Sequence, residues 1–145
     1  MSREIKFDYI VKTWSIYNQD NTKDELYPPE INHYRMKLEE IEGRNFFNKL
    51  DRFGWKYEII ARRQFTGLKD NNGKEIYEGD IVKFYYSDPC QAFVQTGSIV
   101  YVLDIYGPRF LFQDMNPGLG KRDLWFTESF FEVIGNIYEN PGLLE

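Results

Sequence analysis

The stretch from Gln64 to Phe84 constrains the fold most, because it places two tight turns between three short apolar runs. The first turn, Asp70 to Gly73, contains an Asn-Gly pair, which is the strongest short-range signal for a β-hairpin. The second turn runs from Glu78 to Asp80, and a further strand-like run follows it. Two turns so close together predict a curled sheet or a small SH3-like barrel.

The segments on either side of this centre are also typical of strands. Residues 5–17 mix β-branched and aromatic side chains, and residues 55–62 alternate along the chain as a strand with one buried face does. A long strand is predicted over 93–106, ending at a turn formed by Gly107 and Pro108. We therefore expect the 145 residues to form a single mainly β domain, with the β core over 55–139.

One segment, residues 28–54, departs from the strand pattern. After Pro28 and Pro29, apolar residues recur at the helical spacings of three and four. They are Ile31, Tyr34, Leu38 and Ile41. Gly54 is well placed to end a second short helical run. These spacings predict a helical insertion that packs on one side of the sheet.

The charge of the chain bears on its partners. Its formal net charge is -5, whereas a domain that binds nucleic acid usually carries a basic footprint, so nucleic acid is disfavoured. If nucleic acid is bound, we expect a local positive face made by Arg62, Arg63, Lys69, Lys74 and Lys83. No window approaches the roughly 20 apolar residues of a membrane span, and the start lacks a secretory signal. We expect a cytoplasmic protein of the host cell with no membrane partner.

Residue types that catalysis and metal binding need are scarce. The chain has one histidine, His33, and one cysteine, Cys90, so neither a His-pair site nor a cysteine zinc site can form within it. The turn from Asp70 to Gly73 lacks the ligand spacing of a calcium loop. Acidic residues cluster at Glu75, Glu78 and Asp80, but near turns such side chains more often bind backbone amides. We expect no enzymatic activity and no cofactor; a metal-dependent enzyme built on these three acids is the weakest alternative.

The motif GLKDNNGKEIYEGD, residues 67–80, together with the ending FEVIGNIYENPGLL, residues 131–144, resembles the YopX family. The opening REIKFDYIVKTW is also similar to the start of that family. These are small proteins encoded mainly by bacteriophages and prophages. The resemblance implies a mainly β fold and a phage or prophage origin in a Gram-positive-type host. It implies no activity, because the family has no agreed function or catalytic site.

We expect the motif residues to serve the fold by forming turns rather than a binding or catalytic site. They are Gly67, Asn72, Gly73, Gly79 and Gly135. We therefore favour a non-enzymatic interaction protein that self-associates and binds a host or phage protein. Aromatic residues make up 18% of the chain, and aromatics are enriched at buried partner surfaces. The alternative is an accessory nucleic-acid-binding protein of phage replication or regulation. In either case we expect function in the helical insertion and on the aromatic strand faces.

Overall fold

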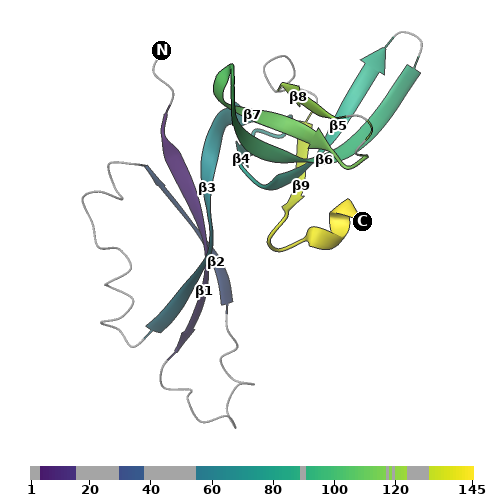
Figure 1. Cartoon of the computed structure of the whole chain (residues 1–145). Coiled ribbons are helices and arrows are strands. Elements are labelled where there is room, and N and C mark those ends of the chain that lie inside the picture. Colours follow the sequence, from purple (N-terminus) through teal and green to yellow (C-terminus); the bar gives the residue numbers. More distant parts are fainter. Residues whose placement is uncertain are drawn as a thin grey trace. The chain divides into compact units, whose positions relative to one another are not determined.

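The computed structural model describes residues 4–15, 30–37, 55–88, 91–116, 118, 120–123 and 131–145. Strands dominate these residues, and a short 3-10 helix, η4 (Pro141–Leu144), follows the last of them (Figure 1). The strands are β1 (Lys6–Ser15), β2 (Glu30–Lys37), β3 (Trp55–Lys69), β4 (Glu75–Tyr77), β5 (Asp80–Asp88), β6 (Gln91–Asp104), β7 (Gly107–Asp114), β8 (Lys121–Asp123) and β9 (Phe131–Asn136). The chain divides into two compact units, Met1–Gln64 and Phe65–Glu145. The single domain over 1–145 stays a prediction.

In the first unit, β1 is the central strand and pairs antiparallel with β2 on one side and β3 on the other. Ile10 and Val11 are adjacent in sequence, so their side chains point to opposite faces of the sheet, and both are fully buried. A central strand that is covered on both faces explains why the sequence here is continuously apolar rather than alternating. The pairing with β3 shifts by one residue between Ile10 and Val11, which leaves Ile60 of β3 as a bulge.

The helix predicted after Pro28 is wrong over Glu30–Lys37, because these residues form β2. Their exposure alternates along the strand, with Asn32, Tyr34 and Met36 half-buried and Ile31 exposed. The spacing of three from Ile31 to Tyr34 therefore joins two faces of a strand rather than one face of a helix. Pairing with β1 outweighs the local helical pattern, as tertiary context often does. The rest of the predicted insertion lies outside the described residues.

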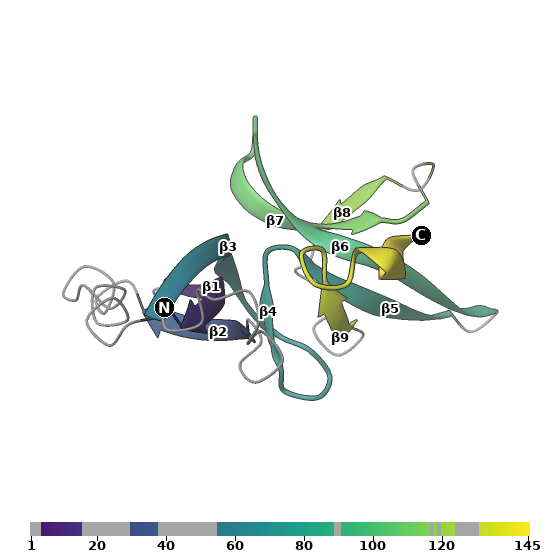
Figure 2. The same cartoon turned by 90° about the horizontal axis from the view of Figure 1, so that it is seen from below.

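The second unit contains a five-stranded antiparallel sheet in the order β8-β7-β6-β5-β9. Figure 2 shows the strong twist of β5, β6 and β7, which curls this sheet into a half-barrel. The short strand β4 pairs with the end of β3, at Phe65 and Lys69. The predicted mainly β fold with a curled sheet is confirmed. Within the described residues, no helix has the length and hydropathy needed to span a bilayer.

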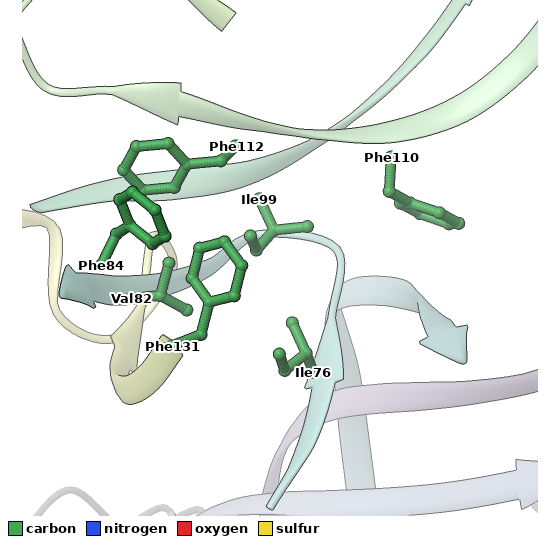
Figure 3. Close-up of a cluster of buried hydrophobic side chains, with 7 residues drawn as sticks. All are labelled: Ile76, Val82, Phe84, Ile99, Phe110, Phe112 and Phe131. Carbon is green, nitrogen blue, oxygen red and sulfur yellow. The ribbon is translucent and has the colours of Figure 1, made fainter. Parts of the chain in front are cut away.

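Among the described residues of the second unit, seven buried side chains form a hydrophobic cluster (Figure 3). They are Ile76, Val82, Phe84, Ile99, Phe110, Phe112 and Phe131. The rings of Phe84, Phe112 and Phe131 lie 5.1 to 5.9 Å apart between centroids. They come from three different strands, so the contacts between these rings stabilise the curled shape of the sheet.

Candidate functional site

The acidic residues of the central motif bind backbone groups. Asp70 is buried, and its Oδ1 accepts hydrogen bonds from the backbone N–H groups of Asn72 and Lys74, each at 2.9 Å. Its Oδ2 accepts one from the N–H of Val133 in β9, also at 2.9 Å. The Asp70 carboxylate thus shapes its own turn and ties that turn to β9.

Asp80 is also buried, and its Oδ2 accepts the backbone N–H of Tyr77 at 2.8 Å, which closes the second turn. Glu75 accepts a long hydrogen bond of 3.4 Å from the Tyr77 hydroxyl. Glu78 is half-buried beside them. Across the part of the chain that the structure describes, no three His, Cys, Asp or Glu side chains gather closely enough to hold a metal ion.

The first turn is a bulged hairpin turn rather than type I′. The N–H of Gly73 donates to the carbonyl of Asp70 at 3.0 Å, and Gly73 has a φ of +80°. Asn72 has no positive φ, which a type I′ turn would require of it. The left-handed conformation therefore falls on Gly73 alone, as in a type I turn followed by a bulge.

The two motifs of the family resemblance interlock. The N–H of Asn71 donates to the carbonyl of Phe131 at 2.9 Å, and the N–H of Ile137 donates to the carbonyl of Gly79, also at 2.9 Å. At Gly135 a Cβ atom would lie 2.6 Å from Asn140 Oδ1, so a larger residue there would have to displace the Asn140 side chain. Gly67 adopts a φ of +88° within β3. Gly67 and Gly135 thus lie within β3 and β9 rather than in turns, whereas Asn72, Gly73 and Gly79 lie in the two turns of the central motif. The hydrogen bonds of Asn71 and Gly79 join this motif to the end of the unit.

The five basic residues of the nucleic-acid alternative do not form one face. Arg62 and Arg63 follow each other on β3 and so point to opposite faces of the sheet. Arg62 is exposed with its guanidinium carbon 4.1 Å from the Phe7 ring centroid. In the second unit Lys69 lies opposite Glu75 in the strand register, and Lys83 lies opposite Glu132. Lys74 is exposed just after the first turn.

Arg63 belongs to a buried ion pair. It is 2% exposed, and its Nη2 donates to Oδ2 of the fully buried Asp8 at 2.5 Å, with Nε at 3.2 Å. The same oxygen lies 2.8 Å from Nδ1 of His33. This arrangement fixes β1 against both of its neighbours, because Asp8, His33 and Arg63 come from β1, β2 and β3. Arg63 is thus a structural residue rather than part of an exposed binding face.

The hairpin between β6 and β7 repeats the chemistry of the first turn. In Asp104–Gly107 the N–H of Tyr106 donates to Asp104 Oδ1 at 2.9 Å, and Gly107 has a φ of +90°. Both hairpins thus follow the pattern Asp-x-x-Gly, with an aspartate that binds the turn backbone and a left-handed glycine. They differ at the two central positions, which are Asn-Asn in Asp70–Gly73 and Ile-Tyr in Asp104–Gly107. Ile105 is 91% exposed and Tyr106 is 76% exposed.

Side chains on one face of this hairpin hold the tip in place. Arg109 donates from Nη2 to Asp104 Oδ2 at 2.8 Å and from Nη1 to Asp123 Oδ1 at 2.9 Å. Its guanidinium carbon also lies 5.1 Å from the centroid of the Tyr106 ring. The backbone N–H of Tyr106, followed by Arg109, lowers the pKa of Asp104. The Asp104 bond in turn raises the pKa of Arg109.

The other face of the hairpin continues the core face of the sheet beyond the core. Residues 99, 101 and 103 alternate with their neighbours, so Tyr101 and Leu103 share the face of buried Ile99. The Tyr101 ring packs edge-on against buried Phe110, 5.2 Å between centroids, yet Tyr101 is 43% exposed and Leu103 is 76% exposed. We call Tyr101 and Leu103, together with Ile105 at the adjoining tip, the apolar strip.

Sequence reasoning missed the apolar strip, because the pattern predicts a strand over 93–106 and a turn only at Gly107 and Pro108. The structure ends β6 at Asp104 and puts Ile105 and Tyr106 in the turn. The signal was present in the sequence, since Asp-x-x-Gly at residues 104–107 repeats the spacing of residues 70–73.

The chain matches a protein-family model and is similar to a solved structure. Residues 11–145 match the family model described as YopX protein. The crystal structure of protein EF1440 from Enterococcus faecalis is 24% identical, and the alignment covers 94% of this chain and 98% of that chain, with a TM-score of 0.38. No curated protein matches.

Proposed function

This chain belongs to the YopX family, and from that premise we propose that it is a phage-type, non-enzymatic protein of the host cytoplasm. In this proposal it acts by binding proteins, including further copies of itself, through the tip of the β6–β7 hairpin. A host or phage protein is the second kind of partner.

The observation that carries the proposal is the pair Ile105 and Tyr106 at the tip. The turn Asp104–Gly107 needs its aspartate and its glycine. The turn Asp70–Gly73 of the same unit shows that two asparagines can occupy the central positions of such a turn. Folding therefore does not require two large apolar residues here. Leaving them in water exposes an apolar patch, and such patches mark interaction sites.

The tip is also preorganised for binding. Arg109 bridges Asp104 and Asp123 and lies over the Tyr106 ring, so the side chains around the turn have fixed partners. A contact element that is already ordered loses less conformational entropy when it binds. Tyrosine, as at Tyr106, is one of the residue types enriched among those that dominate binding energy.

The family motifs support a non-enzymatic role. Asp70 and Asp80 use their carboxylate oxygens on backbone N–H groups of their own turns and of β9. Among the described residues, the most exposed large apolar side chains are those at and beside the hairpin tip: Ile105, Leu103 and Tyr106. The burial of Arg63 and the glutamates opposite Lys69 and Lys83 favour protein over nucleic acid as the partner.

The double variant Ile105→Asn/Tyr106→Asn tests the proposal, because it gives the hairpin the same Asp-Asn-Asn-Gly sequence as the first turn. We expect the variant to fold with an unchanged circular dichroism spectrum and to lose self-association. Light scattering after size-exclusion chromatography, over a range of protein concentrations, measures the association. The control is Val94→Asn, which removes another exposed apolar residue of β6 and should leave association unchanged. A wild-type chain that stays monomeric, or a double variant that associates normally, would contradict the proposal.

A further inference from the structure

We propose that the apolar strip binds the same strip of a second copy, so that two β6–β7 hairpins pack face to face about a twofold axis. This inference rests on the proposed function and names its partner and geometry. A twofold interface uses one patch twice, so the patch must be complementary to itself. An uncharged apolar strip meets this condition.

The two faces of the hairpin separate apolar from charged groups. Tyr101 is paired with Phe110, and Leu103 with Pro108, on the face that continues the core. Val102 is paired with Arg109, and therefore the cluster of Arg109 and Asp104 lies on the opposite face. Bringing two strips together leaves the carboxylates of both copies on the outside, where water solvates them.

Net charge selects among partners for such a strip. Each chain carries a formal charge of -5, which repels polyanions and anionic surfaces. Two copies also repel each other, but exposed charges more than about 8 Å apart are largely screened at physiological ionic strength. We therefore expect the dimer to tighten as salt rises, which is the reverse of the behaviour of a complex with nucleic acid.

The size of the strip sets the strength of the contact. Its three side chains are 43%, 76% and 91% exposed. Together they offer on the order of 400 Å² per copy, about half of the ~800 Å² per partner that stable complexes bury. The contact therefore belongs to the weak class of interfaces, and the dimer should form only at high protein concentration.

Disulfide trapping tests the geometry. In a Cys90→Ser background, Leu103→Cys places one thiol on the strip, and Gln113→Cys places one on the opposite face, where Gln113 is also exposed. Close to a twofold axis a residue meets its own copy, so Leu103→Cys should form an intermolecular disulfide under mild oxidation. Gln113→Cys should remain monomeric on a non-reducing gel. Thermal melts of both variants show whether they are folded.

The outcomes separate the inference from the proposed function. If the wild-type chain is monomeric at all concentrations, both fail. If the wild type associates but Leu103→Cys does not crosslink, or Gln113→Cys crosslinks equally, self-association stands and the face-to-face pairing is overturned. Selective crosslinking of Leu103→Cys, with association that strengthens as salt rises, supports the pairing.

Discussion

At the scale of single residues, Asp70 shows how much one buried carboxylate can organise. It accepts three backbone hydrogen bonds, two inside its own turn and one from Val133. Asp70→Asn keeps the shape of the side chain but places an amide NH₂ where an acceptor is needed. We expect it to lower the free energy of unfolding by about 2 to 3 kcal/mol, because hydrogen bonds to charged groups are the stronger ones. Urea denaturation measures the change, with Glu58→Gln on the exposed surface of β3 as the control; equal effects would refute this role.

Asp104 gives a prediction about pH. The Tyr106 N–H and Arg109 hold the pKa of Asp104 below its usual value of 3.8. A carboxylate whose pKa is lowered by folding stabilises the fold above its unfolded pKa, and this stabilisation is lost as the pH falls through the folded pKa. We therefore expect the tip to stay ordered at neutral pH and to loosen in acid. An NMR titration of the Tyr106 amide should show a midpoint below 3.8, and a midpoint at or above that value would contradict the prediction.

At the scale of elements, β6 and β7 approach each other unusually closely at Gly97. A Cβ atom there would lie 2.2 Å from the backbone carbonyl oxygen of Gln113 and 2.7 Å from the Phe112 ring. The register runs through Gly97 without a shift on both sides, so the glycine marks close packing rather than a β-bulge.

Gly97→Ala should therefore destabilise the protein through overpacking, by about 1 to 3 kcal/mol. Gly118→Ala is the matched control, because the nearest atom to its Cβ would lie 3.4 Å away, at Asn116 Oδ1. Thermal unfolding of the two variants side by side measures the difference. Similar melting temperatures for both would show that the sheet absorbs the added methyl group.

The first turn and β2 show which elements could be predicted from the sequence and which could not. The turn at Asp70–Gly73 follows from local chemistry, and the structure has it where the Asn-Gly pair places it. Residues 30–37 were interpreted as helix because a few apolar spacings fit both patterns, and only pairing with β1 decides between them. Local periodicity cannot decide such a case, since the paired residues of β1 lie 17 to 31 positions away in the sequence.

At the scale of the whole molecule, the curled sheet was predictable and the candidate site was not. The curl follows from two close turns and many apolar strand positions. Whether Leu103 and Ile105 are buried or exposed depends on where the core ends, and that is set by Phe84, Phe112 and Phe131 meeting from three strands. No single stretch of sequence holds this information. The hydrogen bond from Asn71 to Phe131 could not be predicted from the sequence for the same reason.

The interlock also has a kinetic consequence. The bond from Val133 to Asp70 joins residues 63 positions apart, and the chain must close this large loop before β9 can dock. The β6–β7 hairpin, whose partners are close in sequence, can form without that step. In a fold dominated by such distant contacts, docking of β9 should limit the rate of folding. The hairpin that we assign to recognition would then be among the first parts of the second unit to take shape.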